Sequence, residues 1–232
     1  MRRLLTLPYI GGFLLASLAL ASCSPGEPKA ADKPKDGGLM PVSDPKERLD
    51  EQRLEDATKG LSFNSGVVTV TVHNAGGRNK AVQATAIAER SLNTENTWFK
   101  AVGLYRDAIL IDPTYAAPYE GMARSLLLEG KVDYAEAALR TALSLDPSFN
   151  TARYELGVVL LKKDDNAGGM AVWKDLAKRD PAYPELYGRM AVLCYYDHDY
   201  KAAWAYLDEA DKRKQNVPSQ FRTLLKEVAP RP

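Results

Sequence analysis

The sequence predicts an all-α fold, a right-handed solenoid of about four helix–turn–helix units closed by a C-terminal capping helix. The first observation is a repeat, because "IDPTY" at Ile111, "LDPSF" at Leu145 and "RDPAY" at Arg179 recur at equal intervals. The second is that each interval holds two stretches with apolar residues at helical spacing on more than one side. Since neither helix of such a pair can bury these residues alone, successive units are expected to stack into one continuous core.

Small residues recur at the register where the two helices of a unit would cross closely, at Ala101, Ala135, Gly169 and Ala203. With the length of the interval and the proline near the end of each unit, the pattern resembles the tetratricopeptide repeat. The resemblance covers Val82 to Gln215, and residues 82–217 are assigned to four repeats, of which Ala116 to Phe149 matches best. Three residues depart from the repeat pattern. Glu89 stands where the family has a small residue, Arg153 where it usually has an aromatic one, and Gln215 where the fourth proline is expected.

Residues 218–232 are expected to form the capping helix and a tail. Between Pro218 and Val228 the apolar residues follow the i, i+3, i+4, i+7 pattern of an amphipathic helix, and Pro230 prevents its continuation. The expected inward face consists of Phe221, Leu224, Leu225 and Val228. Together with the four repeats, this gives nine packed helices.

Residues 1–22 have the features of a secretory signal peptide, with Arg2 and Arg3 preceding an uncharged apolar run. The four residues 20–23, Leu-Ala-Ser-Cys, resemble the bacterial lipobox, in which the cysteine receives a diacylglycerol and becomes the first residue of the mature protein. The resemblance implies a lipid anchor, palmitate included, on Cys23. Because Ser24 is not the aspartate associated with inner-membrane retention, the periplasmic face of the outer membrane is favoured. The alternatives are an ordinary signal peptide cleaved after Ala21 or Ser22, which would leave a free thiol, and an uncleaved anchor.

Two further segments separate Cys23 from the repeats. Residues 23–60 are expected to be a disordered Pro/Gly-rich tether that ends in a short, weakly packed helix beginning after Asp44. Residues 61–81 contain six consecutive β-branched residues, Val67 to Val72, and are expected to be extended or β. One interpretation is a small hairpin with residues 61–63 packed on the first repeat. The other is an edge, with Val68, Val70 and Val72 on one face, that pairs with another chain by strand addition.

Charge and motifs argue against catalysis and nucleic-acid binding. Arg2 and Arg3 are two of the 31 basic side chains, so the chain without them has 29 basic and 30 acidic side chains, interleaved and without a basic stripe. The sequence contains no catalytic or phosphate-binding motif, and we expect no enzyme, cofactor or metal. Cys194 is expected in the core and His198 in a turn between helices. With Cys23 lipidated, Cys194 has no partner for a disulfide.

In tetratricopeptide arrays the first helices of successive units line a concave groove that binds extended peptides or helices. The resemblance implies such a groove here, with apolar, aromatic and cationic side chains that suit an amphipathic peptide. The alternative for each residue is packing against a neighbouring helix or the N-terminal segment. A chaperone-tail clamp is not implied, because its Lys/Asn/Arg sites carry Ala86, Arg90 and Glu155. The expected groove residues are Gln83, Arg90, Glu120, Arg124, Leu127, Leu128, Tyr154, Val158, Leu161, Lys162, Val192, Tyr195 and Tyr196.

The favoured function is a membrane-anchored adaptor or scaffold that binds a protein partner in the bacterial cell envelope. A lipobox followed by repeats resembles the pilotin lipoproteins that assist secretin assembly for type IV or Tad pili and for secretion. An adaptor for peptidoglycan hydrolases is the alternative within this class. The second class is a small-molecule-binding or enzyme-accessory domain that uses Cys194, His198 and the tyrosines. The sequence leaves the partner and the oligomeric state open.

Overall fold

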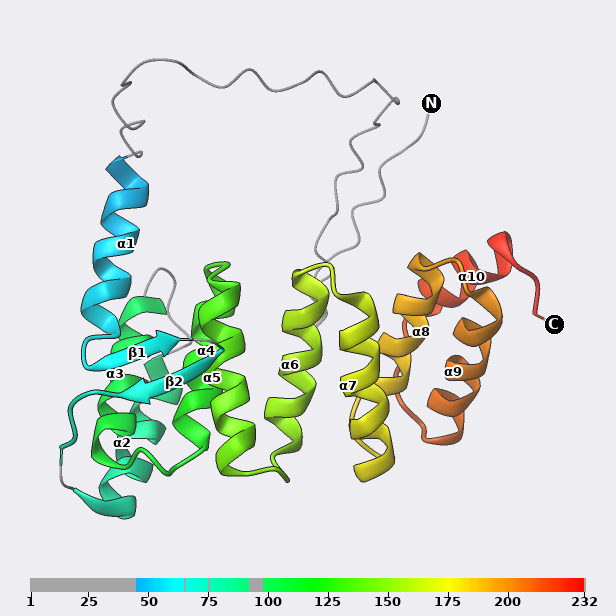
Figure 1. Cartoon of the computed structure of the whole chain (residues 1–232). Helices are drawn as coiled ribbons and strands as arrows, with labels where there is room; N and C mark the ends of the chain where they lie inside the picture. Colours follow the sequence, from blue (N-terminus) through cyan, green and yellow to red (C-terminus); the bar gives the residue numbers. More distant parts are fainter. Residues whose placement is uncertain (1–44, 65, 75, 92–97, 232) are drawn as a thin grey trace, which may run out of the picture. The chain divides into compact units, whose positions relative to one another are not determined.

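The computed structural model describes residues 45–64, 66–74, 76–91 and 98–231, which belong to the unit spanning Ser43–Pro232. The expected signal peptide, Cys23 and the Pro/Gly-rich segment lie outside the described residues. Within them the chain forms ten helices and one short two-stranded sheet, so the predicted helical solenoid is confirmed (Figure 1). None of the described helices is both long enough and apolar enough to span a bilayer.

Eight helices form four sequential pairs. The two helices of each pair pack together, and the second helix of each pair packs on the first helix of the next. The first pair begins at Gly77 and not at Val82, because residues 78–81 are also helical; Gly77, at the start of α2, has a left-handed φ of 73°. The pairs are α2 (Gly77–Ser91) with α3 (Trp98–Ile111), α4 (Ala117–Leu128) with α5 (Val132–Leu145), α6 (Asn150–Lys162) with α7 (Asn166–Arg179), and α8 (Leu186–Tyr196) with α9 (Tyr200–Lys212).

The turn inside each of the last three pairs is built in the same way. Gly130, Asp164 and His198 occupy the same position of successive repeats, and all three have a left-handed backbone, with φ of 68°, 61° and 61°. The carboxylates of Asp165 and Asp199 then accept hydrogen bonds from backbone N–H groups and cap α7 and α9. These contacts confirm that the acidic residues after α6 and His198 are turn and cap residues.

Gln215 replaces the fourth repeat proline and ties two turns together. Its Nε2 donates to the carbonyl of Tyr183 at 2.6 Å, and its Oε1 accepts from the backbone N–H of Tyr187 at 3.1 Å. The chain then enters the capping helix α10 (Ser219–Val228). Phe221 and Leu225 are buried, but Leu224 and Val228 are 41% and 49% exposed. The expectation that all four face the array is therefore wrong for two of them.

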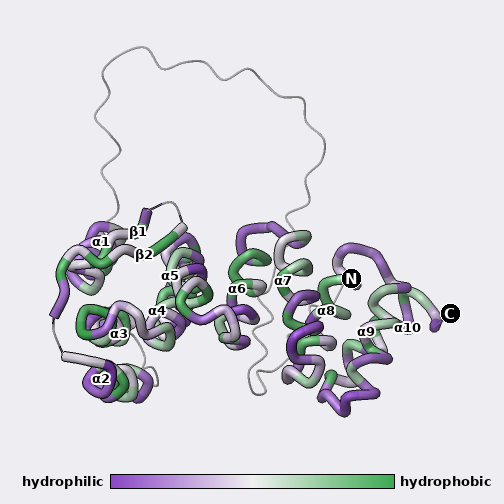
Figure 2. Tube along the Cα trace, turned by 60° about the horizontal axis from the view of Figure 1, so that its bottom comes forward, coloured by the Kyte–Doolittle hydropathy of each residue, from purple (hydrophilic) through white to green (hydrophobic). Residues whose placement is uncertain are grey.

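The N-terminal elements cover the second helices of the first two repeats. Helix α1 (Pro45–Ala57) packs on α3, and Leu54 and Ala57 supply its buried residues. Figure 2 shows α3 between α2 on one side and α1 on the other, which agrees with the packing of both helices on α3. The helix predicted to be weakly packed is thus attached to the first repeat.

Strands β1 (Leu61–Asn64) and β2 (Val67–Val70) form the predicted hairpin, with Leu61 opposite Val70 and Asn64 opposite Val67. The hairpin packs mainly on α5 of the second repeat, so the expectation of packing on the first repeat is wrong for this element. The reason is a pair of specific contacts. The N–H of Val68 donates to Thr141 Oγ1 at 2.8 Å, and the Phe63 and Tyr134 rings lie 4.9 Å apart.

The three predicted edge residues differ in their accessibility. Val68 is buried, Val70 is half-buried, and Val72 lies beyond the end of β2 and is 55% exposed. The N–H of Val68 is already bonded within the chain. Strand addition at this edge stays a prediction, and Val72 is its most accessible position.

Candidate functional site

The first helices α2, α4, α6 and α8 carry the residues that the sequence nominated for partner binding. We call this surface the first-helix face and define it by Arg90, Glu120, Arg124, Leu127, Leu128, Tyr154, Val158, Lys162, Val192, Tyr195 and Tyr196. First helices of successive repeats also contact each other, α2 with α4 and α4 with α6. Because α1 and the hairpin pack chiefly on α3 and α5, the N-terminal elements are placed on the second helices instead.

The first-helix face divides into exposed and packed side chains. Leu128 and Tyr196 are 61% and 64% exposed, the highest values among the large hydrophobic side chains of the described residues. The cations Arg90, Arg124 and Lys162 are exposed as well. The remaining apolar members are partly buried and help to pack neighbouring helices: Leu127, Tyr154, Val158, Val192 and Tyr195.

Glu120 is the buried acid of this face, with 7% of its surface exposed. Arg124, one turn later on α4, places Nη1 3.5 Å from Glu120 Oε1. This distance exceeds the 2.7–2.9 Å typical of a charged hydrogen bond, and no donor among the described residues hydrogen-bonds to this oxygen. Burial raises the pKa of Glu120 from 4.5 to about 6, an effect that the positive charge of Arg124 only partly opposes.

The side chain of Tyr105, on the second helix α3, lies near Glu120. Gly121 makes this possible, because a Cβ there would collide with the Tyr105 ring. The phenol is fully buried, its hydroxyl has no hydrogen-bond partner among the described residues, and burial raises its pKa to about 12. Charges on Arg124, Glu89 and Glu120 also act on this hydroxyl. Glu120 Oε1 and the Tyr105 hydroxyl are thus two buried polar atoms of one site, and neither makes a hydrogen bond among the described residues.

Two further charged residues lie on the first helices of the next repeats. Sequence reasoning did not assign them to the site. Glu155 on α6 is half-buried, and its pKa is raised by burial, against the opposing charges of Arg124 and Arg189. Arg189 on α8 lies over the Tyr154 ring at 5.8 Å and pairs with Glu185 at 3.7 Å. Glu155 and Arg189 occupy the same position of successive repeats, so extending the aligned register by one position would have found both.

Tyr154 contacts both Arg189 and aromatic residues of the core. Its ring stacks on Trp173 with centroids 5.8 Å apart and lies 5.2 Å from Tyr183. The backbone carbonyl of Tyr154 accepts from Trp173 Nε1 at 3.0 Å, and burial raises the pKa of the Tyr154 hydroxyl. Tyr154 is therefore chiefly a packing residue. This agrees with the alternative interpretation of the groove residues, in which they pack against a neighbouring helix.

The C-terminal end of the face is aromatic. The ring of Tyr195 lies within 6 Å of the rings of Tyr196, Tyr200 and Phe221, at 5.6, 5.9 and 5.7 Å. Tyr195 is half-buried in this cluster, whereas Tyr196 projects to solvent. The accessible ring of Tyr196 thus rests against the packed ring of Tyr195.

Cys194 and His198 do not form a reactive pair. Burial raises the pKa of the Cys194 thiol to about 11, and His198 Nδ1 lies 2.9 Å from the Tyr200 hydroxyl. The part of the chain that the structure describes contains no group of three or more His, Cys, Asp or Glu side chains able to hold a metal ion.

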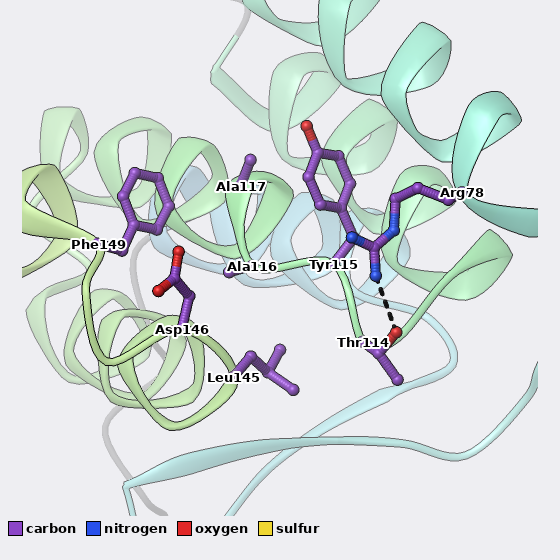
Figure 3. Close-up of a pocket in the computed structure, with 8 residues that line it drawn as sticks. All are labelled: Arg78, Thr114, Tyr115, Ala116, Ala117, Leu145, Asp146 and Phe149. Atoms are coloured by element: carbon purple, nitrogen blue, oxygen red, sulfur yellow. Dashed lines mark hydrogen bonds between the residues drawn. The ribbon is translucent and has the colours of Figure 1, made fainter.

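A small cavity of about 230 Å³ lies away from these residues, among the turns that join successive repeats (Figure 3). Its polar wall is Arg78, whose guanidinium is already engaged by Asp112 at 2.5 Å, by Thr114 at 3.0 Å and by the ring of Tyr115 at 4.8 Å. Asp146 accepts from the Ser148 backbone N–H and hydroxyl, which lowers its pKa. The cavity is a junction of turns, and none of the residues predicted to bind a partner lines it.

The fold is a tetratricopeptide-like solenoid. No protein-family model matches the sequence, and no curated protein gives a significant match. Two crystal structures of MamA each share 15% identity with the chain over 59% of its length, covering 79% and 74% of MamA, with TM-scores of 0.54 and 0.53. The TPR2AB domain of yeast Sti1 in complex with pHSP90 is 18% identical over 68% of this chain and 52% of its own, with a TM-score of 0.44. Similarity at this level concerns the fold.

Proposed function

We propose that the protein is a non-catalytic adaptor that holds a segment of a protein partner on its first-helix face. The observation that carries this proposal is the presence, on the first helices, of accessible Leu128 and Tyr196 together with the buried carboxylate of Glu120, whose Oε1 accepts no hydrogen bond among the described residues. A buried carboxylate oxygen without a hydrogen bond costs folding free energy, and such groups are enriched at functional sites. No arrangement around Cys194 or His198 favours a small-molecule or enzyme-accessory role.

The proposal includes membrane attachment through Cys23 in the bacterial cell envelope. Its support is the sequence of residues 1–23, with a basic start, an uncharged apolar run and a lipobox-like end. Cys23→Ala is expected to release the protein from membranes while leaving its helical circular dichroism unchanged. Loss of the helical signal would contradict the separation of anchor from fold.

Within the envelope we favour assistance to the assembly of a secretin, pilus or secretion complex. An adaptor for peptidoglycan hydrolases uses the same face and the same anchor, so the two roles differ only in the partner. The partner is therefore what an experiment has to identify.

The test is site-specific photo-cross-linking in living cells, with captured proteins identified by mass spectrometry. The probe positions are Leu128 and Tyr196, with exposed Ala171 on the second helix α7 as the matched control and Val72 as the strand-edge position. Capture of a secretin or pilus component at Leu128 and Tyr196 supports the assembly role, and capture of a wall hydrolase supports wall remodelling. Capture only at Val72 overturns the proposed binding face in favour of strand addition.

A further inference from the structure

The acidic site around Glu120 specifies the chemistry of the partner segment. Glu120 Oε1 and the Tyr105 hydroxyl are both buried, both able to accept hydrogen bonds, and both without a hydrogen bond among the described residues. A buried acceptor without a donor costs free energy that a correctly placed donor recovers. The Arg124 guanidinium, 3.5 Å away, does not hydrogen-bond to Glu120 Oε1, so a donor placed closer to this oxygen would recover that free energy.

The charges that face the site favour a cation. From the elements packed around Glu120, the groups acting on it are Arg124 on its own helix, Glu155 on α6 and Glu89 on α2. The charges of Glu89, Glu155 and Arg124 act on Glu120, and Arg189 acts in addition on Glu155. A ligand cation would improve this balance, whereas a ligand anion would face three carboxylates.

Arg124 offers a route by which a cation can enter. Its side chain is 45% exposed, its contact with Glu120 is long at 3.5 Å, and its charge also acts on Glu155. Turning an exposed arginine from one carboxylate toward the next requires only side-chain rotation. A basic side chain from the partner would then take the place of the Arg124 guanidinium beside Glu120.

From this geometry we infer that the partner segment carries a lysine or arginine that binds between Glu120 and Glu155, beside apolar residues that rest on Leu128. The inference rests on the proposed function, because it assigns the chemistry of the segment bound on the first-helix face. Lysine and arginine carry three and five N–H donors and no acceptor, which matches two buried oxygens that accept no hydrogen bond. Leu127 and Leu128 follow Glu120 by two turns of α4 and supply the apolar contact.

The test is selection of a displayed library of random dodecapeptides on the full chain in mild detergent, run in parallel on wild type, Glu120→Gln and Glu129→Gln. Glu129 is the matched control, because it is exposed at the end of the same helix. We expect the peptides selected on wild type and on Glu129→Gln to share a basic residue flanked by apolar ones. We expect Glu120→Gln to lose that enrichment and to bind the wild-type peptides at least tenfold more weakly.

The outcomes separate the inference from the proposed function. Enriched peptides without a shared basic residue, or an enrichment that persists in Glu120→Gln, overturn the inference and leave the adaptor function standing. If no peptide is enriched on wild type, peptide binding by this face is overturned together with the inference. Circular dichroism verifies that each variant is folded, and Glu155→Gln provides a second variant on the neighbouring repeat, expected to weaken binding in the same direction.

Discussion

Arg153 Nη2 donates to the carbonyl oxygen of Pro147 at 2.7 Å, and the hydroxyl of Tyr119 makes the equivalent bond to Pro113 at 3.0 Å. The two donors are one repeat apart, as are the two prolines, so a guanidinium performs in the third repeat what a phenol performs in the second. Arg153 is buried, and its Nε also pairs with Asp175 at 3.1 Å. The departure from the repeat pattern thus preserves in α6 the bond that ties α4 to its preceding turn.

Arg153→Met is expected to lower the free energy of unfolding by about 2 kcal/mol, because it leaves the Pro147 carbonyl without its charged donor. Arg153→Tyr is expected to lose less, since tyrosine makes this bond in the second repeat. Urea denaturation followed by circular dichroism measures both changes. Equal losses in the two variants would mean that the contact with Asp175, which both remove, carries the stability.

Gly121 and Gly103 provide a matched pair for testing close packing. A Cβ at Gly121 would overlap the buried ring of Tyr105, so Gly121→Ala is expected to destabilise the protein by about 1–3 kcal/mol. Gly103 lies inside α3 with nothing within 4 Å of an added methyl group, so Gly103→Ala is expected to stabilise by about 0.5–1 kcal/mol through helix propensity. Thermal denaturation of both variants measures whether each substitution lowers or raises the stability of the protein. A neutral Gly121→Ala would show that Tyr105 can move away.

The repeat architecture could be predicted from the sequence because the signal is periodic. The constant spacing fixes the turns, and the small residues fix where the helices cross, so the positions of Ala135 and Cys194 follow from the alignment. The place of the hairpin could not be predicted in this way. It depends on the bond from Val68 to Thr141 and on the contact of Phe63 with Tyr134, which join distant parts of the chain and leave no periodic trace.

The site was predictable only in part for a related reason. Repeat register identifies which residues lie on the first helices, and it therefore nominated Glu120 and Arg124. It does not tell which side chains are buried, because burial depends on neighbours such as Tyr105, which reaches the site only through the gap at Gly121. The involvement of Glu155 likewise emerges from the electrostatics between repeats.

Thr141→Val tests how the hairpin is attached. Removing the hydroxyl leaves the buried N–H of Val68 without an acceptor, at a cost of about 1–3 kcal/mol, most of it confined to the hairpin. Hydrogen exchange of the Val68 amide should become faster while exchange in α8 and α9 is unchanged. Thr223→Val is the control, because Thr223 makes only an exposed bond within α10. Unchanged exchange at Val68 would show that apolar packing alone holds the hairpin.

Glu120→Gln is expected to make the unliganded protein more stable at neutral pH. The folded-state pKa of Glu120, about 6, lies above its ordinary value of 4.5, so the folded state binds this proton more tightly than the unfolded state does. The resulting cost is present in full above about pH 6 and is lost as the pH falls toward 4.5. It amounts to about 2 kcal/mol at 1.36 kcal/mol per pKa unit.

The glutamine variant should therefore unfold at a higher temperature than wild type at pH 7.5, and most of this difference should vanish at pH 4.5. Thermal denaturation at the two pH values measures the effect, with exposed Glu129→Gln as the control that should change neither value. A variant that is less stable at pH 7.5 would mean that the ion pair with Arg124 holds α4 in place and that Glu120 is retained for the fold. A more stable variant that no longer enriches basic peptides would show that this carboxylate is kept for binding, at the expense of stability.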